Sequence, residues 1–474
     1  MAKRYKLFIG GKWISSRETM PVIDPFNGQT VATVAMAGQA EMERAVMAAE
    51  KAFETTKSMS SYATATILRK AAAGIEKSRK RLVEAIVSEA GKPVTLAENE
   101  VDRSITTFTV AAEEASRIGG QWLPVDIDTN SGGRIALTKR FPVGVVAGIS
   151  PFNFPLNLVA HKVAPAIASR NCIVLKPASK TPISALILGE ILEAAGVTPG
   201  QYNVVPCSRE VGEALATDPR VAKLTFTGSP AVGWRLMKLA SGKKVTLELG
   251  GNAASVIHSD ADLDWAVARS AKGAYVYAGQ TCICVQRILI HKPVYSKVVK
   301  ALINEIKEKI RTGDPRRKDV LAGPMINDAA LAQTKEWVAQ AVAGGARILA
   351  GGKAQGPCFQ PTLLENVKRD MNVVCREVFA PVAVVQSYSD FDEALDMVND
   401  SEYGLQVGVF TSGLKEAFSA FEKARVGGVI INDFPTFRVD NMPYGGVKLS
   451  GFGREGVRWA IEEMTEIKVM VIKP

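Results

Sequence analysis

The chain has few of the residues that build metal centres, histidine-based catalytic sites or disulfide frameworks: three histidines and six cysteines among 474 residues. His161, His258 and His291 lie far apart in the sequence, so we expect no metal site and no histidine-based triad. Six scattered cysteines are too few to cross-link a chain of this length. The N-terminal stretch has no apolar run typical of a secretory signal, so we expect a cytoplasmic protein with reduced thiols.

Long apolar runs are also missing. The most apolar region, 141–169, is interrupted by several prolines and by Lys162, so we expect no membrane span and no membrane partner. The overall composition, 47% hydrophobic and 22% charged, is that of an ordinary globular protein. The net charge of +10 is spread along the chain, which favours a solvated surface that attracts small anions; we expect no nucleic-acid partner.

Strand patterns and helical patterns alternate from about residue 140 onward. One series of strand-like runs occupies 143–149, 171–178, 202–206, 223–228 and 244–251, and a second lies near 287–291, 383–387, 405–411 and 427–432. Helical patterns occupy 40–56, 62–90, 182–195, 231–240, 262–278, 294–311, 329–344, 391–399 and 413–424. This alternation predicts an α/β fold with two domains, each a parallel sheet covered by helices. The run 465–472 predicts a terminal strand.

Two glycine-rich stretches compete for a phosphate-binding role. GFGREG at 451–456 has the formal GxGxxG spacing, but the residues before it do not resemble a buried strand, so we interpret it as a tight loop. GSPAVG at 228–233 follows a clear strand and opens a helix, with Ser229 as N-cap. Free amides at such a helix start attract phosphate, although an ordinary strand-to-helix turn has the same pattern.

Cys282 and Cys284 stand one residue apart in GQTCIC. No second ligand pair supports zinc, and a disulfide between residues this close would be strained. A buried core cysteine is the favoured interpretation for Cys284, whereas Cys282 could also be a nucleophile. Glu248, at the end of a strand in LELGG, is a candidate base, with a surface glutamate as the alternative. Asn153, in the stiff loop PFNFP, could stabilise an oxyanion or only a turn.

Seven motifs occur in an order and spacing that resemble the aldehyde dehydrogenase superfamily. They are PFNFP, LKPAS, FTGSPAVG, LELGG, GQTCICVQR, REVFAP and NMPYGGVKLSGFGREG, and they span 151–456. FIGGKW and DPFNG near the start fit the same family. The pattern is most similar to lactaldehyde, phosphonoacetaldehyde and non-phosphorylating glyceraldehyde-3-phosphate dehydrogenases. The resemblance implies NAD(P)-dependent oxidation of an aldehyde to a carboxylic acid.

The resemblance also implies the catalytic roles. Cys282 would attack the aldehyde to form a thiohemiacetal, Asn153 and the backbone N–H of Cys282 would hold the oxyanion, and Glu248 would activate the water that hydrolyses the thioester. The alternative is an acylating, coenzyme A-dependent semialdehyde dehydrogenase. That branch usually lacks a glutamate at the LELGG position, so Glu248 favours hydrolysis.

The cofactor would be NAD or NADP. Lys176 and Glu377 would hold its ribose hydroxyls, Phe379 would pack near the nicotinamide ribose, Ser229 would meet the pyrophosphate and Gly212 would lie near the adenine. The resemblance extends the expected cofactor site to Ile149, Ser150, Pro151, Phe152, Ser179, Gly228, Gly233 and Leu249. Ser179 stands where strictly NAD-dependent members often carry a glutamate that repels a 2′-phosphate. We therefore hypothesise that NADP is accepted.

Substrate selection and architecture follow the same resemblance. Arg103 and Arg438 match positions that bind anionic groups in relatives, so we expect a short polar or anionic aldehyde; salt bridges to Glu98, Glu100 or Asp440 are the alternative. We expect a Rossmann-like cofactor domain at 1–121 and 143–250, and an α/β catalytic domain at 251–446. A small β element at 122–142 and 447–474 would support a homo-oligomer, a dimer or a homotetramer.

Overall fold

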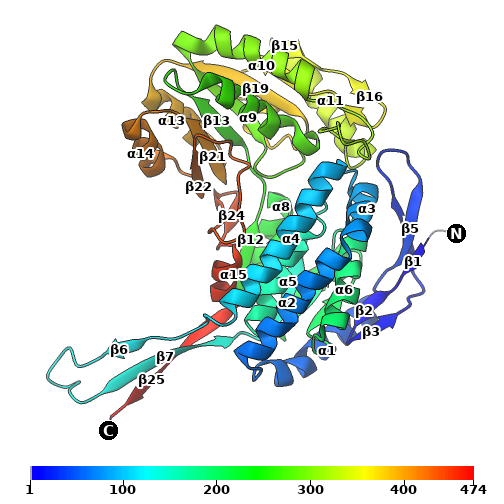
Figure 1. Ribbon diagram of the computed structural model, residues 1–474, viewed down its shortest axis with the longest axis vertical. Helices are drawn as coiled ribbons and strands as arrows, with labels where there is room; N and C mark the ends of the chain where they lie inside the picture. Colours follow the sequence, from blue (N-terminus) through cyan, green and yellow to red (C-terminus); the bar gives the residue numbers. More distant parts are fainter. Residues whose placement is uncertain (1–2, 474) are drawn as a thin grey trace.

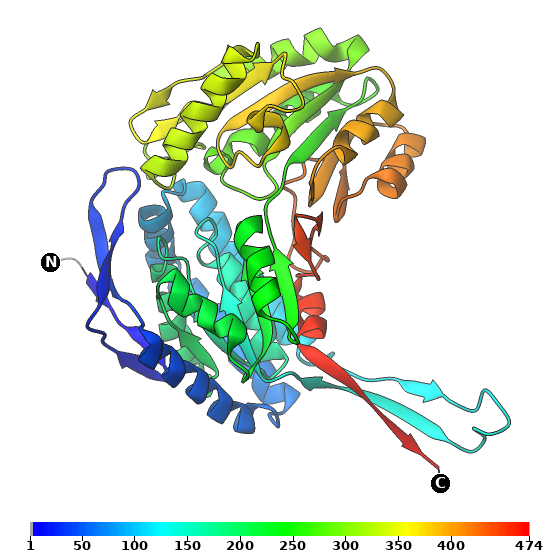
Figure 2. The ribbon, with the colours of Figure 1, turned by 180° about the vertical axis from the view of Figure 1, so that it is seen from behind.

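The computed structural model describes residues 3–473 and has two α/β domains with a β arm (Figure 1). The first domain contains the N-terminal helices, and the second contains the strands and helices of residues 253–431. The arm projects from the first domain in both opposite views (Figures 1 and 2). The predicted fold class is confirmed: an α/β chain with a Rossmann-like part, a second α/β part and a small β element.

The first domain is built on an eight-stranded sheet in the order β24-β12-β11-β8-β9-β10-β2-β3. Its five central strands are parallel, and β24, β2 and β3 pair in the antiparallel sense at the two edges. The bounds are β2 Leu7–Ile9, β3 Lys12–Ile14, β8 Val145–Ile149, β9 Cys172–Lys176, β10 Tyr202–Val204, β11 Val221–Thr227, β12 Lys244–Glu248 and β24 Gly451–Phe452. β8 and β9 are apolar except for Lys176 at the end of β9, because both faces of the sheet are covered.

Helices cover the two faces of this sheet, and alternate residues of the strands contribute to two separate cores. Val146 of β8 packs with the helices of one face, whereas Val145 and Ala147 pack with those of the other. The first set is α2 Ser61–Lys77, α3 Arg79–Ala90, α4 Val94–Glu114, α5 Asn157–Ala168, α6 Ile183–Ala195 and α15 Val457–Glu463; the second is α1 Gln39–Thr56, α7 Arg209–Thr217 and α8 Pro230–Leu239.

The N-terminal part of the chain differs from the sequence-based expectation in two ways. The helical pattern at 62–90 is not one helix, because Ser78 leaves helical geometry between α2 and α3 (φ −95°, ψ 6°). Short strands also precede the helices, and three of them form a separate sheet in the order β1-β5-β4. These are β1 Lys3–Tyr5, β4 Thr19–Ile23 and β5 Thr30–Ala35.

The second domain is built on a seven-stranded sheet in the order β15-β18-β19-β14-β13-β21-β22, in which only β15 is antiparallel among the described strands. Its strands are β13 Ala253–Ile257, β14 Val285–His291, β15 Arg347–Ala350, β18 Thr362–Glu365, β19 Val382–Tyr388, β21 Gln406–Phe410 and β22 Gly428–Ile431. The accompanying helices are α9 Leu263–Tyr275, η1 Val276–Gly279, η2 Lys292–Val294, α10 Tyr295–Lys309, α11 Asp328–Ala343, α12 Asn372–Cys375, α13 Phe391–Asn399 and α14 Leu414–Lys423. Two short antiparallel pairs are β16 Ala354–Gln355 with β17 Cys358–Phe359, and β20 Tyr403–Gly404 with β23 Val447–Lys448.

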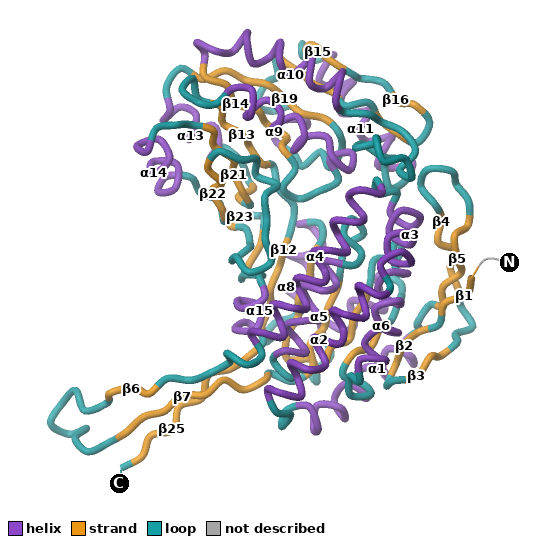
Figure 3. Tube along the Cα trace, in the orientation of Figure 1, coloured by secondary structure: helices purple, strands orange, loops and turns teal. Residues whose placement is uncertain are grey.

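The arm is a three-stranded antiparallel sheet that extends away from the helices (Figure 3). It consists of β6 Trp122–Pro124, β7 Ile135–Pro142 and β25 Thr465–Ile472. The predicted terminal strand is confirmed, but 447–464 does not lie in the arm, because β24 extends the eight-stranded sheet and α15 packs into the core of the first domain. Oligomerisation through the arm stays a prediction. No helix within residues 3–473 combines the length and apolar character needed to cross a membrane.

Candidate active site

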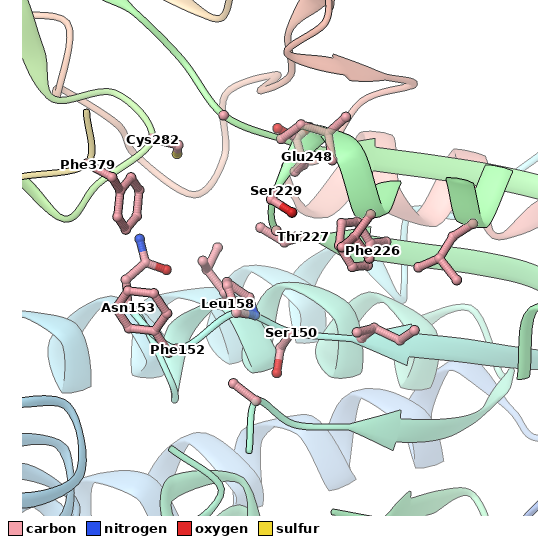
Figure 4. Close-up of a pocket in the computed structure, with 18 of the residues that line it drawn as sticks. Ser150, Phe152, Asn153, Leu158, Phe226, Thr227, Ser229, Glu248, Cys282 and Phe379 are labelled. Carbon is pink, nitrogen blue, oxygen red and sulfur yellow. The ribbon is translucent and has the colours of Figure 1, made fainter. Parts of the chain in front are cut away.

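The carboxyl ends of four neighbouring parallel strands lie in one row at the edge of the eight-stranded sheet. Ile149 is the register partner of both Lys176 and Phe226, and Thr227 is the partner of Glu248. Loops that leave this edge meet loops of the second domain around a cavity of about 550 Å³ (Figure 4). Ligands of open α/β sheets bind in the crevice at this edge.

Most of the residues expected from the sequence line this cavity. They are Ile149, Ser150, Pro151, Phe152, Asn153, Lys176, Gly212, Gly228, Ser229, Glu248, Leu249, Cys282, Glu377 and Phe379. Ser179 is exposed and follows Ala178, which lines the cavity, while Gly233 packs from α8 against Leu249. Arg103 and Arg438 do not line the cavity.

Two glycines of the cavity wall pack tightly against side chains that also line the cavity. A Cβ at Gly228 would lie 2.6 Å from the ring of Phe226, and one at Gly212 would lie 2.4 Å from Cδ of Lys176. Buried Ser150 has a hydroxyl without a hydrogen-bond partner among the described residues, as expected for a group that binds a ligand. These residues fit a dinucleotide. By contrast, GFGREG contributes β24 and a loop and does not line the cavity, so its interpretation as a loop outside the dinucleotide site agrees with the structure.

Cys282 lies between η1 and β14 and is partly buried. Its Sγ is 3.2 Å from the hydroxyl of Tyr444. Burial, together with the nearby carboxylates of Glu377 and Glu248, raises the pKa of the Cys282 thiol to about 11, so the thiol holds its proton at neutral pH. Cys284 directs its thiol elsewhere, toward the backbone carbonyl of Ala274 in α9, at 3.2 Å.

Glu248 is buried at the end of β12, with 3% of its surface exposed, which rules out the alternative of a surface glutamate. Neither carboxylate oxygen has a hydrogen-bond partner within residues 3–473. Burial raises the pKa of Glu248 well above its usual range, and the neighbouring carboxylate of Glu455 adds to the effect. A carboxylate without partners beside a cavity is free to accept a proton from a molecule inside it.

Asn153 points from the loop after β8 toward the loop that carries Cys282 (Figure 4). Its Nδ2 donates a hydrogen bond to the carbonyl of Gln280 at 2.9 Å, and the side chain is buried. This contact places an amide donor close to the sulfur, as an oxyanion site requires. On the same side, the rings of Phe152 and Phe379 meet edge to face at 5.8 Å, with Phe379 at a positive φ of 53°.

Glu377 accepts a hydrogen bond from the backbone N–H of Gly251 at 3.0 Å. Burial raises the pKa of this carboxyl to about 7. A Cβ at Gly250 would lie only 2.1 Å from a Glu377 oxygen. Glycine at this position therefore allows the carboxylate to approach the segment of the backbone that connects the two domains.

The two arginines expected to select the substrate belong to one network. Nη2 of Arg103 donates to Asp440 at 3.0 Å, and Nη2 of Arg438 donates to Nδ1 of His161 at 2.5 Å. Asp440 also accepts from His161 Nε2 at 2.6 Å. The alternative of a salt bridge to Asp440 therefore holds for Arg103, whereas Glu100 pairs with Lys92. Both arginines keep a buried Nε without a partner among the residues that the structure describes.

Several residues near the site were not identified from the sequence, among them two charged residues and a tyrosine. Arg209 and Glu213, on α7, line the cavity and form an ion pair at 3.0 Å. The start of α7 after a predicted strand would have indicated Arg209 as a candidate. The guanidinium of Arg438 stacks on the ring of Tyr444 with Cζ 3.6 Å from its centroid, so Tyr444 connects Arg438 to Cys282. No local sequence signal predicts that contact.

Known proteins resemble the chain over its whole length. Residues 13–470 match the aldehyde dehydrogenase family. The 3-sulfolactaldehyde dehydrogenase of Priestia aryabhattai is 43% identical over 471 residues, which cover 99% of this chain and 98% of the relative.

Two solved structures show the same fold. Aldehyde dehydrogenase 21 from Physcomitrella patens, in complex with the reaction product succinate, has a TM-score of 0.98 and 42% identity, covering 100% of this chain and 98% of that one. The glyceraldehyde-3-phosphate dehydrogenase GapN from Methanocaldococcus jannaschii DSM 2661, complexed with NADP, has a TM-score of 0.93 and 38% identity, covering 97% of this chain and 100% of that one. With a family match this complete and relatives this similar, the chain belongs to the aldehyde dehydrogenase family.

Proposed function

We propose that this NAD(P)-dependent aldehyde dehydrogenase oxidises a short anionic aldehyde to its carboxylic acid through an acyl intermediate on Cys282. The observation that carries the proposal is the meeting of a thiol, a buried carboxyl without partners and an amide donor in one cavity, contributed by Cys282, Glu248 and Asn153. A second set of groups, Arg438 with its partners His161 and Asp440, is linked to the sulfur through the side chain of Tyr444.

Acylation begins when the Cys282 thiol loses its proton, because the thiolate is the nucleophile. Sulfur attacks the aldehyde carbon, the C–S bond forms and the carbonyl oxygen becomes an oxyanion. The side-chain amide of Asn153 and the backbone N–H of Cys282 donate hydrogen bonds to this oxygen, which stabilises the tetrahedral thiohemiacetal. A nicotinamide cofactor held in the cavity would supply the acceptor for the hydride that leaves the substrate carbon, and this step would leave a thioester on Cys282.

Residues of both domains would hold the cofactor along the cavity wall. Glu377 would accept hydrogen bonds from ribose hydroxyls, Lys176 would donate to them, and the free amides at the start of α8, beside Ser229, would bind the pyrophosphate. Lys176 and Arg209 supply positive charge on the wall, which favours binding of an additional phosphate. Ser179 brings no negative charge to that region, so we propose that NADP is a substrate.

Deacylation is the task of Glu248. Its carboxylate takes a proton from a water molecule, the water oxygen attacks the thioester carbonyl, and the C–S bond breaks to release the acid and the thiolate. The burial of Glu248 supports this role, because it raises the pKa of the carboxyl toward the range of an effective base. The acylating, coenzyme A-dependent alternative is not favoured, since it has no use for this glutamate.

The substrate class rests on the position of Arg438. Tyr444 contacts the sulfur through its hydroxyl and the guanidinium through its ring face. An acid group on a short carbon chain would reach the guanidinium of Arg438 while its aldehyde carbon lies at Cys282. The relatives support this choice, because sulfolactaldehyde and succinate both carry an acid group on a short chain.

Product analysis tests the proposed function most simply. The purified enzyme is supplied with NAD or NADP and with short aldehydes in matched pairs, one member with a terminal carboxylate, sulfonate or phosphate and one without. We expect the free acid to form without coenzyme A, and the anionic member of each pair to have the higher kcat/KM. Formation of acid only when coenzyme A is added, or a preference for the neutral member, would overturn the proposal.

A further inference from the structure

Tyr444 is the residue that contacts the sulfur of Cys282 directly. The distance from its hydroxyl oxygen to Sγ is 3.2 Å, and 3% of the tyrosine surface is exposed. The roles derived above for Asn153, Glu248 and the arginines leave this contact without a function. A hydroxyl group fixed beside a nucleophilic sulfur can form a hydrogen bond with it, whether the sulfur is a neutral thiol or a thiolate.

The main chain around Tyr444 is held in place on both sides. Its N–H donates to the carbonyl of Glu455 at 3.0 Å, and the N–H of Glu455 donates back to the carbonyl of Tyr444 at 2.7 Å. The Glu455 side chain is itself fixed by the buried ammonium of Lys162 at 2.9 Å. The ring packs in a small apolar cluster with Ile283 and Leu405, so the hydroxyl is positioned before any substrate arrives.

The ring also carries a cation on its face. Cζ of Arg438 lies 3.6 Å from the ring centroid of Tyr444. A guanidinium in this position withdraws electron density from the ring and makes the phenol a stronger hydrogen-bond donor. Burial nevertheless keeps the phenol protonated, because it raises the pKa of Tyr444 well above its usual value. The group available to the sulfur is therefore an O–H donor.

The surroundings of the sulfur create a need for such a donor. Burial and the carboxylates of Glu377 and Glu248 all disfavour negative charge on Cys282. A hydrogen bond from a neutral hydroxyl compensates for part of that cost, and a hydrogen bond to a charged group is among the stronger ones in proteins.

We propose that Tyr444 is a catalytic residue whose hydroxyl donates a hydrogen bond to the Cys282 thiolate. The proposal deepens the proposed function and rests on it for the steps that follow. When sulfur attacks the aldehyde, the S–C bond forms, the negative charge moves to the carbonyl oxygen, and the hydrogen bond weakens. When the thioester is hydrolysed, the C–S bond breaks and the charge returns to sulfur, where Tyr444 again stabilises the leaving thiolate while keeping its own proton.

Tyr444→Phe tests this role because it removes one oxygen atom and leaves the ring beneath Arg438. The thiolate absorbance of Cys282 is titrated in the ultraviolet, and its alkylation by iodoacetamide is followed by peptide mass spectrometry, without aldehyde or cofactor. We expect the thiol pKa to rise by about one unit, equivalent to a tenfold smaller thiolate fraction below the pKa. Alkylation at about pH 8 should slow only about threefold, because a more basic thiolate is intrinsically more reactive.

The matched control is Tyr277→Phe. Tyr277 is also buried and also has a cation over its ring, with Lys92 Nζ 4.6 Å from the centroid, but its hydroxyl donates to the carbonyl of Ala90. This variant should leave the titration of Cys282 unchanged. An unchanged titration in Tyr444→Phe, with the unfolding temperature of the parent, would show that Tyr444 only fills space and would overturn the proposal. Because the assay needs no turnover, its result stands apart from whether the aldehyde chemistry is right.

Discussion

Nη2 of Arg438 donates a hydrogen bond to Nδ1 of His161 at 2.5 Å, and Nε2 of the same imidazole lies 2.6 Å from Asp440. The imidazole therefore lies between a guanidinium and a carboxylate, with one ring nitrogen directed toward each. Asp440 fixes the ring, the ring fixes the guanidinium, and the guanidinium keeps a buried Nε free of partners among the described residues. The same guanidinium lies 3.5 Å from the carboxylate of Glu455, and we propose that it also binds the anionic end of the substrate.

Arg438→Met should therefore weaken recognition of anionic aldehydes specifically. We expect KM for an anionic aldehyde to rise about 10- to 100-fold, the value of a lost charge-assisted hydrogen bond, with at most a twofold change for a neutral aldehyde of equal length. Arg269→Met is the matched control, since Arg269 also stacks on an aromatic ring, Phe434 at 3.9 Å, but does not belong to this network. Equal losses for both aldehydes would show that Arg438 has a structural role only.

Ser179→Glu should shift cofactor preference toward NAD. The new carboxylate would stand at the edge of the cavity, beside Ala178, where it repels a 2′-phosphate and can accept from a 2′-hydroxyl. We expect kcat/KM for NADP to fall about tenfold or more, with a change for NAD of about twofold or less. Ser241→Glu makes the same change at an exposed turn after α8 and should alter neither value. An unchanged NADP preference in Ser179→Glu would place the 2′-phosphate elsewhere.

Glu248 makes stability depend on pH. Its folded-state pKa is raised above the unfolded value, so the native protein binds the proton more tightly than the unfolded chain. Stability attributable to this group is fully present below the unfolded pKa and is lost as pH rises through the window up to the folded pKa. Glu248→Gln should consequently raise the unfolding temperature near neutral pH and have little effect at about pH 4. A variant that is less stable than the parent at neutral pH would contradict the burial of an unpaired carboxyl.

The sequence alone indicated several of the candidate site residues, and those that lie at the ends of strands were the easiest to recognise. Their motifs put Glu248 at the end of one strand and Asn153 just after another, and the two strands, β12 and β8, flank β11, so both residues lie at the same edge of the parallel sheet. Cys282 was recognisable because GQTCIC puts two cysteines one residue apart in a chain with only six, and because this motif resembles that of the family.

Contacts between distant loops could not be predicted in the same way. Tyr444 contacts Cys282 although 162 positions separate them in the sequence, and Arg438 contacts His161 although 277 positions separate them. No local sequence pattern indicates either contact. The short N-terminal strands escaped recognition because three residues such as Leu7–Ile9 are too few to establish a period. The break at Ser78 was hidden because apolar residues continue at helical spacing on both sides of it.

The most direct test of the account is intact-protein and peptide mass spectrometry of Glu248→Gln mixed with an anionic aldehyde and NADP. Removal of the base should slow hydrolysis by about 10²- to 10⁴-fold, so that one acyl group accumulates per chain on the peptide containing Cys282. The parent enzyme under the same conditions should carry little of this adduct. Rapid formation of reduced cofactor without any acyl group on Cys282, or an adduct on another residue, would contradict the central claim.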